Sequence, residues 1–170
     1  MRHKKIVAGD LLYHAVHGLC RLDRMIKQNQ SGTKTLCYAL VPKTTNKMKI
    51  RFVIAATDIE VSGFHGLISA KEANQILDYL NAGDGSTAVQ TNQTWVLAQN
   101  ILNFSSDKFG TRDQRKRKIL EHSVKGLVGE LACVLKMTLK ETVARVQKNL
   151  GGISKINLTV LAALTHAAED

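Results

Sequence analysis

The sequence predicts an α+β protein: a small antiparallel, barrel-like β-sheet in the first third, followed by an all-α helical domain. Apolar residues recur at period two up to about residue 60, as in strands that bury one face. Beyond that point they recur at helical spacing. The segment 9–18 (GDLLYHAVHG) marks the start of the sheet, because an apolar strand lies between a Gly-Asp opening and a His-Gly turn. We therefore expect two domains, residues 1–66 and residues 67–170.

Short strands separated by polar turns are expected after that segment. The turns lie at residues 28–32 and 42–47, which are rich in Gln, Asn, Ser, Gly, Thr and Lys. The side chains expected to share a face are apolar and mostly two residues apart: Cys20, Leu22 and Ile26 in one strand, and Leu36, Tyr38 and Leu40 in the next.

The clearest strand comes next, at residues 48–54, where apolar residues at even positions alternate with Lys49, Arg51 and Val53. Because side chains alternate between the two faces of a strand, Lys49 and Arg51 must lie together on the outer face. The cations could guard an exposed sheet edge against aggregation. Alternatively, the edge could pair with a strand of another protein, with the cations setting its orientation.

Helical spacing and capping signals predict the second domain. Ser69–Glu72 and Thr138–Glu141 have the spacing of capping boxes, and each precedes an apolar pattern at helical period. The expected helices begin near residues 70, 92–94, 111, 139 and 154, and the third of them carries a dense basic block. Residues 81–87, rich in Gly, Asp and Ser, form a flexible connection.

Composition favours a polyanionic partner or an acidic protein surface. The net charge is +10 and the isoelectric point is about 9.7. The basic block consists of Arg112, Arg115, Lys116, Arg117 and Lys118 with a single Asp among them. Such a block is either a solvated helix face or a phosphate-contacting surface. Trp95, the only tryptophan, likewise has two interpretations: a core anchor, or an aromatic wedge at a nucleic-acid groove.

The sequence contains none of the short motifs that are typical of enzymes or metal-binding proteins. His14, His17 and Cys20 are three residues apart, so on a strand they would point to opposite faces and could not share a metal ion. The three cysteines are scattered in apolar contexts and indicate reduced thiols. We expect no catalytic residues, no metal and no cofactor. With no membrane span or signal-peptide core, a cytoplasmic protein is expected.

Taken together, these residues resemble the CarD family of bacterial transcription regulators, also called CdnL. Gly9-Asp10 and His17-Gly18 match the opening of the family at the same separation, although His14-Ala15 stands where the family has Tyr-Pro. Three further segments are similar in order along roughly residues 6–150: the strand 49–53 (KIRFV), the passage 59–72 with Gly63-Phe64-His65, and the helical segment 127–132 (LVGELA).

The resemblance implies a non-enzymatic regulator that stabilises the open promoter complex. Residues 1–66 would form a Tudor/SH3-like domain, similar to the polymerase-interacting domain of the transcription-repair coupling factor. That domain would dock on the β subunit of RNA polymerase through Lys49, Arg51 and Phe52. The helical domain would contact promoter DNA at the upstream edge of the bubble, with Trp95 as a minor-groove wedge.

Residues 96–99 lack the basic residues that the family has after this tryptophan. The phosphate contacts would therefore fall to Arg112, Arg115, Lys116, Arg117 and Lys118. We expect a monomeric, nucleoid-associated protein without membrane contact. Two other interpretations of the chain stay open. It could be an RNA- or ribosome-associated module, or it could be an interaction adaptor in which Trp95 is core and the basic block is solvated.

Overall fold

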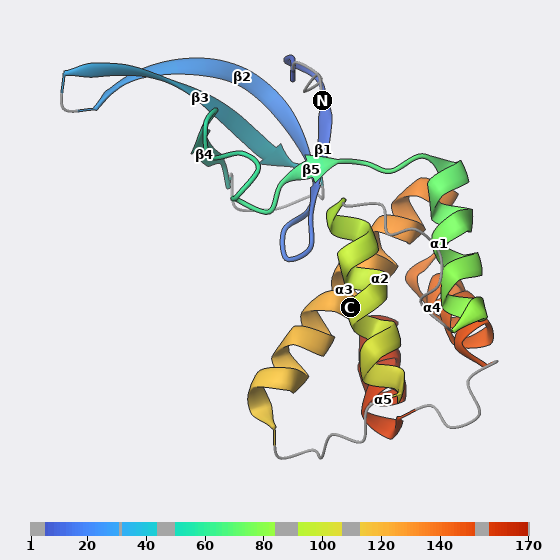
Figure 1. Ribbon diagram of the computed structural model, residues 1–170. Helices are drawn as coiled ribbons and strands as arrows, with labels where there is room; N and C mark the ends of the chain where they lie inside the picture. The colour runs from blue at the N-terminus through green and yellow to red at the C-terminus, as the bar shows by residue number, and fades with distance from the viewer. Residues whose placement is uncertain are drawn as a thin grey trace. The chain divides into compact units, whose positions relative to one another are not determined.

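The structure, a computed structural model of the 170-residue chain, describes residues 6–30, 32–43, 50–83, 92–106, 113–151 and 157–169. It divides into two compact units, Met1–Leu67 and Ile68–Asp170 (Figure 1). The boundary expected from the sequence, between residues 66 and 67, lies one residue before this division. In the described residues, no helix is both long and apolar enough to cross a membrane.

The first unit is a five-stranded antiparallel sheet that curls into a half-barrel, which confirms the α+β class with the sheet first. The strand order is β4-β3-β2-β1-β5, so β4 and β5 form the two edges of the described sheet. The strands are β1 (Leu11–His14), β2 (Gly18–Gln30), β3 (Thr33–Pro42), β4 (Phe52–Ala55) and β5 (His65–Gly66).

The concave face of the sheet holds a small apolar core. Cys20, Leu22 and Leu40 are fully buried there, as the alternation predicted. The other buried members are Leu12, Ile59 and Phe64, with Ile6, Tyr38, Phe52 and Ile54 packed around them. Burial of Cys20 raises the pKa of its thiol to about 11, so the thiol is inert at neutral pH.

The predicted position of Ile26 is wrong. Leu22 pairs with Leu40, but a β-bulge between Leu22 and Arg24 shifts the register, and Ile26 pairs with Cys37. Because Cys37 and Leu40 are an odd number of residues apart on one strand, they point to opposite faces. Ile26 therefore lies on the face opposite Leu22.

The turn predicted at residues 28–32 is shorter in the structure. Strand β2 continues through Gln30, and β3 begins at Thr33. The hairpin extends beyond the paired lengths of β1 and β4, so Leu36 is 40% exposed although it shares the face of Leu40 (Figure 1). The prediction took the polar composition of residues 28–30 as a sign of a turn. Polar residues can also pair as strands where both faces of the ribbon meet water.

The second unit is a bundle of five helices in the described residues, close to the expected set. They are α1 (Ala70–Ala82), α2 (Gln93–Ser106), α3 (Gln114–Leu135), α4 (Leu139–Leu150) and α5 (Leu158–Ala167). Both predicted capping boxes are present, at Ser69 and Glu72 and at Thr138 and Glu141. Hydrogen bonds from Thr138 lower the pKa of Glu141 below its usual value.

One charged side chain lies inside the helical core. Glu130 of α3 is fully buried, and it accepts a hydrogen bond of 2.8 Å from the Thr94 hydroxyl. Its other carboxylate oxygen accepts one of 3.2 Å from the backbone amide of Ile68. Glu130 thus joins α3 to the first turn of α2 and to the chain entering α1. The apolar core around it draws on all five helices.

Candidate functional site

Strand β4 forms one edge of the sheet in the part of the chain that the structure describes. It pairs with β3, and no described strand lies on its other side. The Ala56 amide donates to the Leu36 carbonyl at 2.8 Å, and in an antiparallel ladder every second residue pairs in this way. Ile54 therefore directs its backbone groups toward β3, whereas Val53 directs its own outward. Outward backbone groups are what a strand of another protein needs for pairing.

Arg51 immediately precedes this edge. Its guanidinium contacts the Asp23 carboxylate at 3.4 Å, and the two side chains are 44% and 33% exposed. A long contact between exposed groups contributes about 0–1 kcal/mol, so the guanidinium can exchange partners at little cost. Two apolar side chains beside it, Ile50 and Val53, are 39% and 44% exposed. An open backbone edge, a weakly held cation and exposed apolar groups together form a surface that suits a protein strand. Lys49, predicted beside Arg51, lies outside the described residues.

Phe52 was predicted as a contact residue, but its side chain packs on the core side of the sheet. The ring centroid lies 4.3 Å from that of His17 and 5.8 Å from that of Phe64. The half-buried ring holds β4 against the sheet and is not a protruding contact. Its predicted role as a direct side-chain contact is therefore corrected to one of support.

The histidines behind Phe52 are arranged differently from the prediction. His14 ends β1 and His17 lies in the following turn, so their rings stack at 4.5 Å and do not point to opposite faces. The His14 Nδ1 accepts hydrogen bonds from the amides of Val16 at 3.0 Å and His17 at 3.2 Å. Cys20 lies apart in the core. No cluster of three metal-ligating side chains occurs among the residues described.

Gly63 is required by this packing. Its φ is +87°, and a Cβ at this position would lie 2.8 Å from the His14 Nε2. A side chain here would be strained by the backbone conformation and would displace the histidine ring. The glycine therefore supports the aromatic cluster behind β4.

The basic block lies in the first turns of α3. Asp113 caps this helix by accepting a hydrogen bond of 3.1 Å from the Lys116 amide. Arg115, Arg117 and Lys118 are exposed and Lys116 is half-buried.

Within the described residues, Arg117 forms an exposed ion pair of 3.6 Å with Glu121, and no ion pair involves Arg115 or Lys118. Cations at a helix N-terminus add to the positive end of its dipole. This arrangement disfavours the helix and favours a bound anion. Arg112 lies outside the described residues.

Trp95 is a core residue, which overturns the prediction of an exposed wedge. Its side chain is 6% exposed, and its ring packs edge-to-face on Tyr79 with centroids 5.4 Å apart. Asn92 accepts a hydrogen bond from the Trp95 amide at 3.1 Å and so fixes the start of α2. Within the described part of the chain, the indole N–H has no hydrogen-bond partner. An indole enclosed in this way cannot enter a base step.

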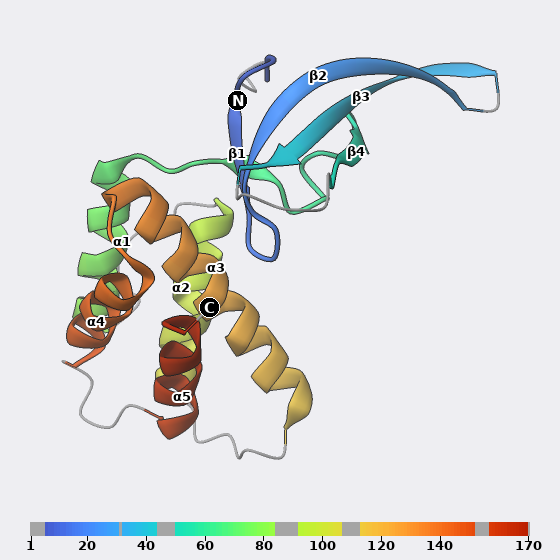
Figure 2. The same ribbon diagram turned by 180° about the vertical axis from the view of Figure 1, so that it is seen from behind.

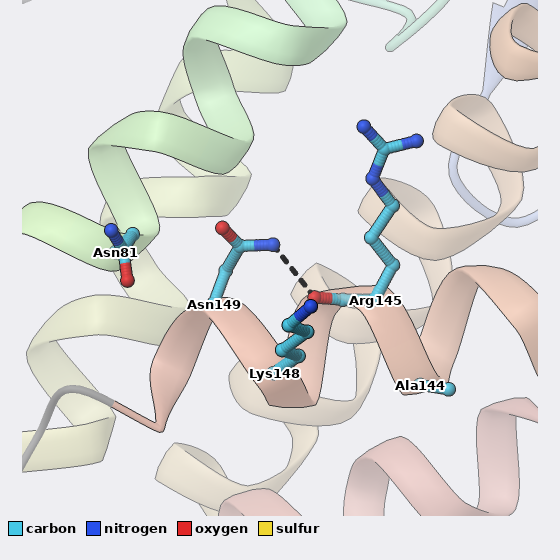
Figure 3. A pocket seen from close by; sticks show the side chains of 5 residues that line it. All are labelled: Asn81, Ala144, Arg145, Lys148 and Asn149. Atoms are coloured by element: carbon cyan, nitrogen blue, oxygen red, sulfur yellow. Dashed lines mark hydrogen bonds between the residues drawn. The ribbon is translucent and has the colours of Figure 1, made fainter.

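A polar groove between α1 and α4 was not predicted from the sequence. It is lined by Asn81, Ala144, Arg145, Lys148 and Asn149 (Figure 3). The Asn149 amide donates to the Arg145 carbonyl at 2.8 Å, and the Arg145 guanidinium donates to Asn74 at 3.1 Å. Figure 3 shows the Arg145 side chain extending away from Asn81. The groove therefore does not bring several polar groups together around one ligand.

Glu130 is the other feature that sequence reasoning missed. Its only signal was a single acidic residue within the apolar run 127–132. The partners that hold it are 36 and 62 residues away in the chain.

No model of a known protein family matches the chain, and a search of curated proteins found no significant similarity.

Proposed function

We propose that this protein is a non-enzymatic transcription regulator that docks on the β subunit of bacterial RNA polymerase through the β4 edge. The observation that carries the proposal is the combination at β4 of an outward backbone edge and an exposed Arg51. Main-chain hydrogen bonds would supply affinity, and the guanidinium would orient the added strand. The curled five-stranded sheet is compatible with a Tudor-like domain, the fold that the sequence resemblance implies.

The helical unit would contact promoter DNA at the upstream edge of the bubble. The exposed cations Arg115, Arg117 and Lys118, at the positive end of α3, are its best phosphate-contacting group. Contacts that form with melted promoter and not with closed duplex would stabilise the open complex, since only differential binding shifts that equilibrium. Trp95 has no direct part in this proposal, because it is buried.

A pull-down from bacterial lysate tests the docking. We expect the wild-type chain to recover the polymerase β subunit and Arg51→Glu to reduce recovery at least about tenfold, as for a charge reversal at an interface. The matched control is Lys71→Glu, the same charge reversal at an exposed cation of α1, which belongs to the helical unit and not to the sheet.

Two results would contradict the docking proposal. One is recovery of polymerase that is indifferent to Arg51→Glu, or reduced equally by Lys71→Glu. The other is recovery of ribosomal RNA in place of polymerase, which would favour an RNA-associated module. Recovery of neither would favour an interaction adaptor with another partner.

A further inference from the structure

The β2–β3 hairpin carries a two-stranded arm that no described strand covers. Strand β1 pairs with β2 only through Gly18–Arg21, and β4 pairs with β3 only through Cys37–Leu40. Beyond those lengths, among the described residues, Gln28–Gln30 and Thr33–Thr35 pair with each other alone, while Leu36, opposite Lys27, also accepts a hydrogen bond from the Ala56 amide. We call residues 27–30 and 32–36 the arm; Figures 1 and 2 show it reaching past the other strands of the sheet. At 3.3 Å per residue, its four residue pairs extend the ribbon by about 13 Å.

The arm gains little from burial. A two-stranded ribbon is marginally stable alone in water, since it has no apolar face to cover. Lys27, Asn29, Thr33 and Lys34 are all exposed, and Cys37 at the base of the arm makes a weak 3.7 Å contact with the Gln28 amide oxygen. The composition of the arm therefore reflects what it faces outside the molecule more than what it packs against.

The charge of the arm has one sign. Residues 24–36 contain Arg24, Lys27 and Lys34 and no Asp or Glu. The register places Lys27 opposite Leu36 and Lys34 opposite Asn29, so both ammonium groups lie on one face together with Leu36 and Met25. Leu36 and Met25 are 40% and 44% exposed. The other face presents amide and hydroxyl groups, including Gln28 and Thr35.

These features fit a nucleic-acid duplex. The major groove is about 12 Å wide and admits a two-stranded β-ribbon, whose cations reach phosphates while amides, hydroxyls and apolar groups meet base edges and thymine methyl groups. We propose that the arm is a second nucleic-acid-binding element, which inserts into a duplex groove and contacts phosphates through Lys27 and Lys34. The arm belongs to the sheet unit, and its binding does not depend on polymerase docking at β4.

Fluorescence anisotropy of the full chain with a labelled DNA duplex of about 20 base pairs, across 50–200 mM salt and without polymerase, tests the arm. Lys27→Gln with Lys34→Gln removes both charges and keeps long polar side chains. We expect binding at least about tenfold weaker at 50 mM salt, and a log–log salt slope shallower by about 1.8, since each lost phosphate contact removes about 0.9. The matched control is Lys71→Gln with Lys140→Gln, two exposed helical lysines, which should change neither quantity.

A second variant tests whether weaker binding results from the loss of the arm itself and not from a loss of hairpin structure in the double variant. Gln28 and Thr35 are cross-strand partners, and because the Leu36 carbonyl points to Ala56, they form a hydrogen-bonded pair of the kind that flanks a two-residue turn. Residues 29–34 can therefore be replaced by Asn-Gly in a Lys27→Gln chain without changing the register of the sheet. This trimmed chain should keep its thermal unfolding temperature and bind the duplex at least as weakly as the double variant.

Three results would overturn the proposal: unchanged affinity and slope in both arm variants, an equal loss in the control pair, or a loss of polymerase recovery with intact duplex binding. The first would leave Lys27 and Lys34 as guards of the strand edges.

Discussion

Glu130 is the residue on which the start of two helices depends. Its carboxylate is fully buried and receives the Thr94 hydroxyl and the Ile68 amide. Burying a carboxylate is tolerated only where donors replace water, and removing it leaves those donors unpaired. Its partners lie far away in the sequence, which is why the residue could not be recognised before the fold was known.

Glu130→Ala should lower the free energy of unfolding by about 2–4 kcal/mol, because it orphans two buried donors and leaves a cavity. Chemical denaturation measures the change. Glu121→Ala, which removes an exposed carboxylate from the same helix, should cost no more than about 1 kcal/mol. Equal effects of the two substitutions would contradict the assigned role of Glu130.

Trp95 shows why a residue type alone does not decide a role. A tryptophan in the first turn of a helix can face the core or the solvent, and the sequence around Trp95 favours neither. The deciding contact comes from Tyr79 on a different helix. Such a contact depends on tertiary packing, so the spacing of residues along the chain does not predict it.

As the only tryptophan, Trp95 reports on its own environment. We expect blue-shifted fluorescence that acrylamide quenches weakly, because the indole is 6% exposed. Adding a DNA duplex should leave the emission maximum unchanged. Strong quenching in the free protein, or a large spectral shift on DNA binding, would instead support an indole that leaves the core to contact DNA.

At the scale of elements, helices were more predictable than strands. Capping boxes at Ser69 and Thr138 and the apolar period located α1 and α4, because these signals are local. The period-two pattern located β2, β3 and β4 but not their register. Nothing in Leu22-Asp23-Arg24 marks a bulge, and the bulge alone moved Ile26 to the other face.

The candidate site was predicted only in part, because alternation along one strand is a local signal and the order of the strands in the sheet is not. Alternation placed Arg51 on the outer face, where it is exposed. The sequence did not show that β4 ends the sheet, since strand order is a property of the whole unit. The same alternation put Phe52 on the opposite face from Arg51, and only the family resemblance made it a contact residue; the rings that cover it come from two loops and were not predicted.

At the scale of the whole molecule, two compact units carry different binding chemistry. The sheet unit offers a backbone edge at β4, and the helical unit offers cations at the start of α3. Main-chain pairing depends weakly on salt, whereas phosphate contacts weaken steeply with it. Polymerase docking should therefore persist at salt concentrations that abolish DNA contact.

The most direct test of docking at β4 is the affinity of Val53→Pro for purified RNA polymerase. Proline removes an N–H that points away from β3, so the sheet should stay folded while strand addition fails. Val53→Thr, which keeps the N–H, serves as the control. We predict at least about tenfold weaker binding for Val53→Pro, with Val53→Thr close to wild type and both chains folded by circular dichroism. Wild-type affinity in a folded Val53→Pro chain would contradict docking by strand addition at β4.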